Sequence, residues 1–322
     1  MNEANRKRRI PDLRYPMDHA AMLAVLDEFV ARYPALSVTT LGQSMLGRWI
    51  PAVRLGVPEY EGKERRRVLY VGAHHGMEWI TTTVLLRFIN EYGELLKSDG
   101  TAEGVRVRAL NEACGIYIVP MLNPDGVDYV INGLAEDNPL RERVIRMNGG
   151  SEDLTHWQAN ARGVDLNHNY NAGFAAYKQL EAEQGIMGGA PTRFSGERPE
   201  SEPETAYLCN YLRFSQPFDA VLTLHTQGEE IYCATKDARD ERTEALAQYV
   251  SRVTGYTLSE PAGTAAYGGF TDWFIKTFGR PSFTLECGKG SNPLPLSDLP
   301  MIYIRLRRLL FEAPLILARL YS

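Results

Sequence analysis

The fold is decided by the stretch RVLYVGAHHGMEW, which spans residues 67–79. Its first half is a short apolar run, typical of a strand buried inside a parallel sheet. Its second half carries two histidines and a glutamate and leads into a helical pattern that continues to Leu96. A buried strand followed directly by a helix is the unit from which α/β domains are built. The stretch therefore predicts an α/β fold with polar side chains just beyond the end of this strand.

Three further apolar runs have the same character, and each is followed by a polar residue. They are Ile116–Met121 before Asn123, Ala220–Leu224 before His225, and Ser282–Leu285 before Glu286. Helical patterns over residues 202–214 and 240–254 separate the later runs, and a last helix is predicted over residues 299–320 with a kink at Pro314. This alternation indicates a largely parallel or mixed sheet. In such folds, functional sites form beyond the carboxyl ends of the strands.

The residues before and between these elements complete the predicted layout. Apolar spacing predicts a helix over residues 18–33, and two β-like runs at 38–41 and 49–55 predict a hairpin. The Gly-, Glu- and Pro-rich stretch over residues 181–199 is predicted to be an exposed loop.

Composition places the chain among ordinary globular proteins. Of its 322 residues, 44% are hydrophobic and 23% charged, and the net charge is −5. That charge argues against a nucleic-acid-binding surface, and no apolar run reaches the roughly 18 residues of a membrane span. We expect an N-terminal tail over residues 1–15 and one catalytic domain over residues 16–322. The oligomeric state cannot be predicted.

The N-terminus and the cysteines indicate a cytoplasmic protein. The first nine residues are polar and basic, and no apolar segment of a signal peptide follows them. Four scattered cysteines without a C-x-x-C pair suit a reducing compartment and argue against a cysteine zinc site. Export by a route that needs no signal peptide stays open.

Three residues form a candidate metal site. His75 and Glu78 have the spacing H-x-x-E at a strand-to-helix junction, which turns both side chains to one side. A catalytic zinc needs three protein ligands and one open position, and His225 could be the third ligand. Glu286, at another strand end, could be the general base. Alternatively, Glu78 is a solvated carboxylate at a helix start and His225 a hydrogen-bonded histidine.

Five blocks in order resemble the zinc carboxypeptidase family. They are GAHHGMEW at 72–79, NPDG at 123–126, GVDLNHN at 163–169, LTLH at 222–225 and FTLE at 283–286. Three further segments, WQANARGVDLN at 157–167, SEPET at 201–205 and ECGKGSNPLP at 286–295, are similar to the γ-D-glutamyl-diamino acid peptidases of that family.

The resemblance implies a single α/β domain with a mixed, mostly parallel sheet of about eight strands flanked by helices. It implies one Zn²⁺ ion held by His75, Glu78 and His225, with Glu286 as general base. Asn167 matches a residue that binds the terminal carboxylate of the substrate, and Asp165 matches an aspartate behind the first ligand.

Several positions depart from the digestive carboxypeptidases. His168 stands where they have a carboxylate-binding arginine, and a histidine is a weaker, pH-dependent anion partner. The arginine that polarises the scissile carbonyl falls near Gln158, and Arg162 could replace it. Tyr267 is a candidate for the mobile tyrosine. Thr271 falls where side-chain selectivity is set and suits a polar diamino acid, although the segment around it could merely begin a helix.

The resemblance implies a zinc metallopeptidase that hydrolyses the γ-D-glutamyl–diaminopimelate amide of bacterial cell-wall peptides. Its partner would be a small peptide such as the murein tripeptide, in the recycling of wall fragments. The alternatives are a carboxypeptidase or deacylase acting on other amides, and a non-catalytic binding protein on the same scaffold.

Overall fold

The deciding stretch forms the predicted strand and turn in a computed structural model of the chain, which describes residues 13–56, 66–215, 217–233, 240–261 and 263–319. β3 (Arg66–Gly72) is buried from its second residue onward. It is followed by the short 3₁₀ turn η2 (Gly76–Glu78) and by α2 (Ile80–Lys97). The predicted tail over residues 1–15 falls almost wholly outside the described residues, so the domain boundary at residue 16 stays a prediction.

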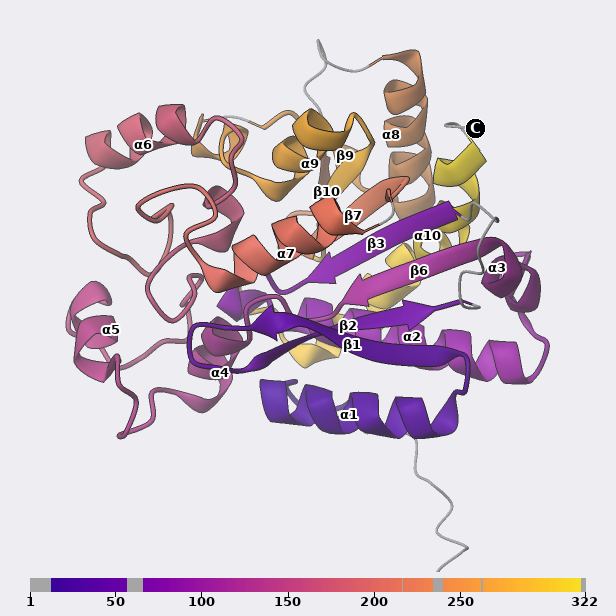
Figure 1. Cartoon of the computed structure of the whole chain (residues 1–322), viewed down its shortest axis with the longest axis horizontal. Coiled ribbons are helices and arrows are strands. Elements are labelled where there is room, and N and C mark those ends of the chain that lie inside the picture. The colour runs from indigo at the N-terminus through magenta and orange to yellow at the C-terminus, as the bar shows by residue number, and fades with distance from the viewer. Residues whose placement is uncertain (1–12, 57–65, 216, 234–239, 262, 320–322) are drawn as a thin grey trace, which may run out of the picture.

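The main sheet has eight strands, in agreement with the predicted mixed architecture (Figure 1). In spatial order they are β1 (Leu36–Gln43), β2 (Trp49–Leu55), β6 (Cys114–Val119), β3, β7 (Ala220–His225), β10 (Ser282–Glu286), β8 (Glu230–Tyr232) and β9 (Thr257–Leu258). The four central strands β6, β3, β7 and β10 are parallel. β1 and β2 form the predicted hairpin, which pairs antiparallel with β6 through β2. A separate pair, β4 (Thr101–Ala102) and β5 (Val105–Arg106), forms a small second sheet.

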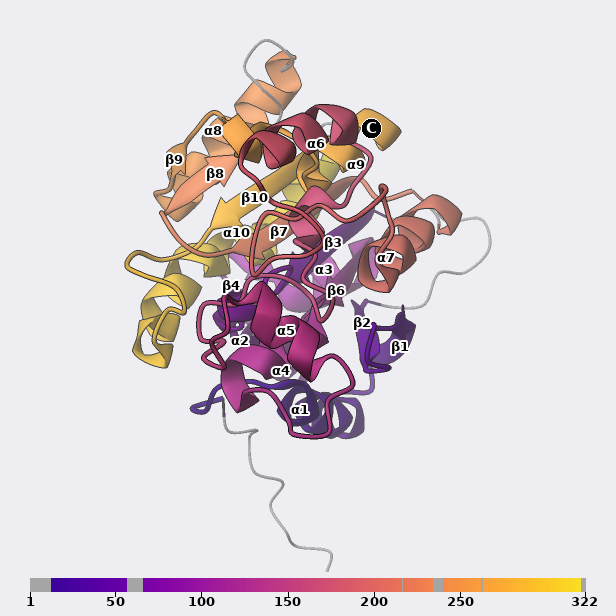
Figure 2. The same ribbon diagram turned by 90° about the vertical axis from the view of Figure 1, so that its left-hand side faces the viewer.

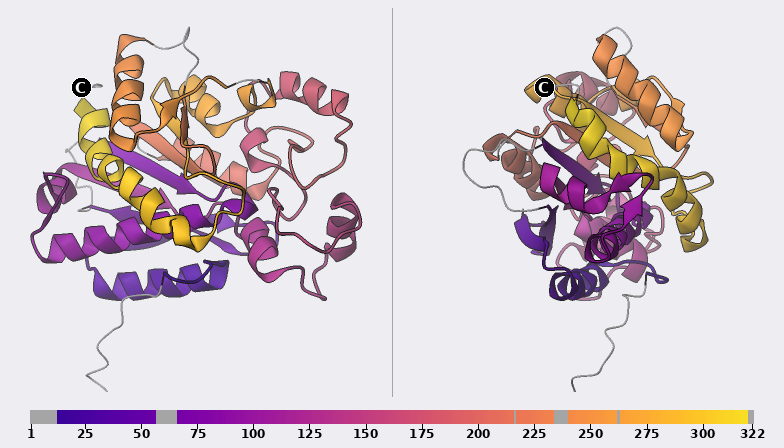
Figure 3. Two further views of the ribbon diagram at one scale, coloured as in Figure 1. Left: turned by 180° about the vertical axis from the view of Figure 1, so that it is seen from behind. Right: turned by 90° about the vertical axis from the view of Figure 1, so that its right-hand side faces the viewer.

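Helices cover both faces of the sheet. Because successive strand residues point to opposite faces, Val68 and Tyr70 of β3 join one core, whereas Leu69 and Val71 join another. The first core includes α1 (His19–Arg32), α2, α3 (Val107–Ala113), α8 (Glu241–Thr254) and α10 (Leu299–Arg319), several of which are seen from behind in Figure 3. The second core includes α7 (Pro203–Phe214) and α9 (Phe270–Phe278). The parallel strands are therefore buried on both sides, as their apolar sequences predict.

The carboxyl ends of the parallel strands lie under a layer of loops and short helices. This layer contains α4 (Pro124–Asn132), α5 (Arg141–Met147) and α6 (Phe174–Glu183), and Figure 2 looks onto it. Asn123 caps α4, since its Oδ1 accepts a hydrogen bond from the N–H of Gly126 at 2.9 Å. Its Nδ2 donates to the carbonyl of His74 at 3.1 Å. The block at residues 123–126 thus ties the loop after β3 to a helix that the sequence pattern did not predict.

One other expectation differs from the structure. Residues 181–199 are not wholly an exposed loop, because residues 181–183 belong to α6. Glu181 is buried there, and its carboxylate accepts hydrogen bonds from the N–H and the hydroxyl of Ser195. The last helix, α10, lies where it was predicted and contains Pro314. Within the part of the chain that the structure describes, none of the helices combines the length and the hydropathy needed to cross a bilayer.

The loop after β3 is packed too tightly for a side chain at Gly76. A Cβ there would lie 2.4 Å from the carbonyl oxygen of Gly126 and 2.8 Å from that of Trp157. We expect Gly76→Ala to lower the free energy of unfolding by about 2 kcal/mol or more, because backbone atoms on both sides must move. Denaturant titration measures this change. Gly104→Asn is the control, since a Cβ at this exposed turn meets no atom within 4 Å and asparagine tolerates a positive φ. Equal stabilities of the Gly76→Ala variant and the parent would contradict the proposed packing.

Candidate active site

The sheet brings together the three strand ends that the sequence singled out. β3, β7 and β10 are parallel neighbours, so their carboxyl ends lie at one edge. His225 and Glu286 are the last residues of β7 and β10 and stand opposite each other in the register. His75 follows β3 by three residues and precedes η2, whose last residue is Glu78.

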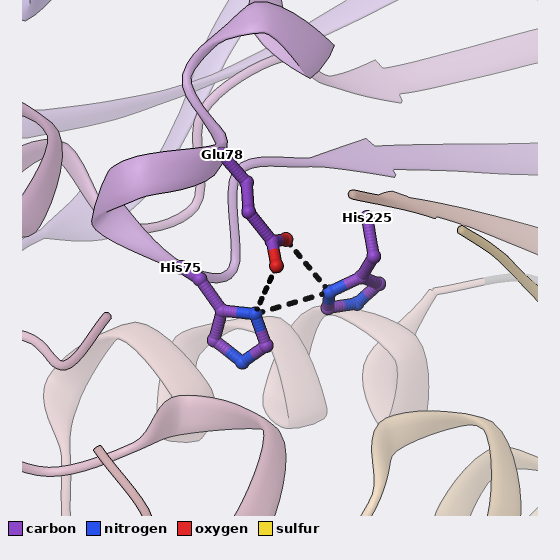
Figure 4. Close-up of side chains that lie close together, drawn as sticks. All are labelled: His75, Glu78 and His225. Carbon is purple, nitrogen blue, oxygen red and sulfur yellow. Dashed lines mark hydrogen bonds and ion pairs between the residues drawn. The ribbon is translucent and has the colours of Figure 1, made fainter. Parts of the chain in front are cut away.

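His75, Glu78 and His225 converge on one buried point (Figure 4). Nδ1 of His75 lies 2.9 Å from Oε1 of Glu78, and Nδ1 of His225 lies 3.0 Å from Oε2 of the same carboxylate. The two Nδ1 atoms are 3.2 Å apart. Zinc ligands with bonds of about 2.0–2.1 Å in a tetrahedral arrangement lie about 3.3 Å from one another, so the spacing of these atoms suits such an ion.

The protonation of His75 explains why this point needs a positive charge. Its Nε2 lies 3.2 Å from Oδ1 of Asp165, a fully buried carboxylate that also accepts hydrogen bonds from the backbone N–H groups of Asn167 and Arg193. An acceptor there fixes the ring proton of neutral His75 on Nε2 and leaves a lone pair on Nδ1. That lone pair faces an oxygen of Glu78, which is also an acceptor. Only a proton or a cation between them relieves the repulsion.

The pKa values express the same demand for a cation. Burial disfavours charge on His75, but Glu78 and Asp165 outweigh it, so the pKa of His75 is raised well above 6.5. Burial likewise opposes ionisation of Glu78, yet His75 and His225 hold the pKa of its carboxyl at about 2. Two imidazoles and a carboxylate that stays ionised are a donor set suited to zinc, so these residues fit the metal that the sequence predicted.

A cavity of about 370 Å³ opens beside this cluster and includes Glu286 in its wall. Burial raises the pKa of Glu286 well above its usual range, and the negative charges of Glu78 and Glu230 act in the same direction. No hydrogen bond to the Glu286 carboxylate is found among the residues that the structure describes. The group is therefore available to a small molecule in the cavity.

Three predicted substrate-binding residues line the same cavity: Asn167, His168 and Thr271. Oδ1 of Asn167 accepts the N–H of Phe270 at 3.1 Å, which leaves its amide N–H groups for a ligand. Nδ1 of His168 donates to the carbonyl of Tyr267 at 2.9 Å. Burial lowers the pKa of His168, so in its neutral form the remaining nitrogen is an acceptor and not an anion donor.

Arg162 and Tyr267, the candidates for the carbonyl-polarising arginine and the mobile tyrosine, are not among the residues that line the main cavity. Arg162 is absent from the lining of the main cavity; its Nε lies 3.8 Å from the buried carboxylate of Glu202, beside a second, much smaller cavity. Gly163, with φ +77°, makes a turn between Arg162 and Asp165. Tyr267 offers only its carbonyl to His168, and its ring lies over Gly173.

Two residues of the cavity wall, Gln158 and Glu230, are not among those to which the sequence patterns gave a function. Gln158 holds its amide between two partners: Nε2 donates to Asp165 at 3.1 Å and Oε1 accepts the hydroxyl of Thr192 at 2.9 Å. Glu230 belongs to β8, a strand of three residues that is too short to show a reliable alternation. The sequence pointed to Gln158 only because the family's carbonyl-polarising arginine falls near this position.

Comparisons with known proteins agree with this geometry. The zinc carboxypeptidase family matches residues 22–303. The chain is 35% identical over 287 residues to a gamma-D-glutamyl-L-diamino acid endopeptidase of Lysinibacillus sphaericus, which covers 89% of this chain and 69% of the relative.

Solved structures share the fold at low sequence identity. Carboxypeptidase A from Helicoverpa armigera superposes with a TM-score of 0.68 at 19% identity, over 96% of this chain and 74% of that one. Murein-tripeptide amidase MpaA from Escherichia coli O157 superposes with a TM-score of 0.51 at 19% identity, over 85% of this chain and 91% of that one.

The metal site makes a prediction about composition. We expect the purified protein to carry about one zinc ion per chain. After dialysis, the variant His75→Ala should carry less than about a tenth of that amount of zinc, because the two remaining ligands hold zinc weakly. Elemental analysis by mass spectrometry measures both. His156→Ala, at an exposed loop position, is the control and keeps its zinc. Full zinc occupancy in the His75→Ala variant would contradict the assignment.

Proposed function

The chain belongs to the zinc carboxypeptidase family, and from that premise we propose that it hydrolyses the γ-D-glutamyl–diaminopimelate amide of cell-wall peptides. The observation that carries the choice of substrate is the 35% identity, over 89% of the chain, to an endopeptidase whose name states that bond type. The chain is a zinc metallopeptidase, and the bond that it cleaves is the part that we propose.

We assign the ion to His75, Glu78 and His225, whose donor atoms lie within 4.8 Å of one another. Zinc in such a site polarises a carbonyl group and lowers the pKa of a water ligand towards neutrality. Asp165 holds the His75 ring by its Nε2–H and keeps the Nδ1 lone pair directed at the site.

Glu286 carries the proton transfers. Its carboxylate takes a proton from the attacking water and then gives it to the departing amine. Burial raises the pKa of Glu286 well above 4.5, so its carboxylate is a stronger base than that of an ordinary glutamate. Gln158 keeps one N–H after its bond to Asp165, and we assign that N–H to the carbonyl oxygen of the substrate in place of Arg162.

The cavity suits cleavage that does not depend on a free terminal carboxylate. Among the lining residues that the structure describes there is neither lysine nor arginine. Neutral His168 supplies no second N–H, so Asn167 is left as the amide donor for a carboxylate. This observation argues against the strict dependence on a free terminal carboxylate that is typical of a digestive-type carboxypeptidase. The murein tripeptide as substrate and the reducing cytoplasm as setting remain part of the proposal.

The substrate and the base are tested together. We expect the zinc-loaded protein to release diaminopimelate from L-Ala-γ-D-Glu-diaminopimelate, measured by chromatography of the products. In Glu286→Gln, kcat falls by about 10²–10⁴-fold because the proton acceptor is lost, while the zinc content is unchanged. A zinc-loaded enzyme that leaves the tripeptide intact but cleaves α-linked peptides would refute the substrate, and a Glu286→Gln variant as fast as the parent would refute the base.

The role of Asp165 is tested by metal affinity. Asp165→Asn keeps the shape of the side chain but removes the charge that supports the Nε2–H of His75. We expect zinc affinity to fall by about 10–100-fold, measured by competition with a chelator of known affinity. Asp153→Asn, at an exposed turn, is the matched control. Equal zinc affinities for Asp165→Asn and the parent would show that Asp165 does not support the ligand.

A further inference from the structure

Glu230 stands beside the reacting groups. It belongs to β8 and lies directly opposite Glu286 in the antiparallel pairing of β8 with β10. Directly opposite residues point to the same face of a sheet, with Cβ atoms about 4.5–5.5 Å apart. Both side chains line the catalytic cavity. A second carboxylate therefore lies within one side-chain length of the proposed base.

This placement is electrostatically unfavourable in the free protein. Like charges directly opposite on neighbouring strands destabilise a sheet. No lysine or arginine among the described residues forms an ion pair with Glu230, whereas the adjacent Glu229 has two such partners, Lys289 and Arg305, each at 3.2 Å. The charge of Glu229 is thus balanced by Lys289 and Arg305, whereas a cationic group bound in the cavity could balance the charge of Glu230.

Neighbouring side chains hold Glu230 in place and extend its wall. The hydroxyl of Tyr232 donates a hydrogen bond to Oε2 of Glu230. Tyr232 stands opposite Thr284, and the hydroxyl of Thr284 lies 2.9 Å from that of Thr271. These residues line the cavity together, so Glu230 continues the wall on which Thr271 was predicted to set selectivity.

We propose that Glu230 is a specificity-determining residue that binds a protonated amine on the residue released by hydrolysis. The proposal rests on the proposed function and adds to it the group that recognises the second amine of a diamino acid. An ammonium has three N–H donors and no acceptor, and a carboxylate fixed by one hydroxyl keeps acceptor positions for it. The bound ammonium also neutralises the charge that faces Glu286.

Two peptides that differ only in the ammonium group test this assignment. They are L-Ala-γ-D-Glu-L-Lys and the same peptide with norleucine in place of lysine, which has the same chain length without the amine. We expect the parent enzyme to favour the lysine peptide in kcat/KM by about 10-fold or more, the size of a charge-assisted hydrogen bond. In Glu230→Gln the preference falls to within about 2-fold. Glu229→Gln, at the balanced neighbour, keeps the preference of the parent.

The zinc content and Tm of each variant are measured alongside the kinetics, so that a folding defect is recognised. A Glu230→Gln variant that keeps the lysine preference overturns the proposal, and so does one in which kcat/KM falls by the same factor for both peptides. So does Asp272→Asn if it abolishes the preference while Glu230→Gln does not, because Asp272 is the other carboxylate of this wall that is neither a proposed zinc ligand nor the proposed base. If the parent cleaves neither γ-linked peptide, the proposed substrate fails, and the same lysine–norleucine comparison on α-linked hippuryl peptides still decides the role of Glu230.

Discussion

Four hydrogen-bond acceptors that meet in a buried space are the constraint on which this structure depends. Two imidazole lone pairs and two carboxylate oxygens face one another at 2.9–3.2 Å. In a medium of low polarity such a cluster is unstable without a positive charge at its centre. The parallel order of β3 and β7 brings the cluster together, and Asp165 behind His75 keeps it from relaxing into an ordinary hydrogen-bonded pair.

The same negative character extends from the cluster into the cavity. Glu286 and Glu230 stand side by side on β10 and β8, next to Glu78. A protein selected for stability alone would separate these charges or pair each with a cation. Their persistence at one strand edge agrees with a site that is completed by an ion on one side and by a cationic substrate on the other, so charge balance links metal binding, proton transfer and substrate choice.

The sequence predicted those parts of the fold and site that depend on strand ends. Apolar runs followed by His75, His225 and Glu286 located three neighbouring strands, because burial on both faces gives a clear pattern. It could not locate Glu230, since a strand of three residues carries no periodicity. It offered Arg162 as a possible neighbour of the scissile carbonyl, whereas that side chain lies beside Glu202, because closeness along the chain says little where a residue with positive φ, Gly163, turns the backbone. The helix after Asn123 was missed because its Asn-Pro-Asp-Gly start resembles a turn.

The most direct test of the account is the location of the metal in a crystal of the purified protein, by anomalous scattering at the zinc absorption edge. We expect one strong peak about 2.0–2.2 Å from Nδ1 of His75, Nδ1 of His225 and an oxygen of Glu78. A zinc peak at another place, or none at this cluster in protein that contains zinc, would contradict it.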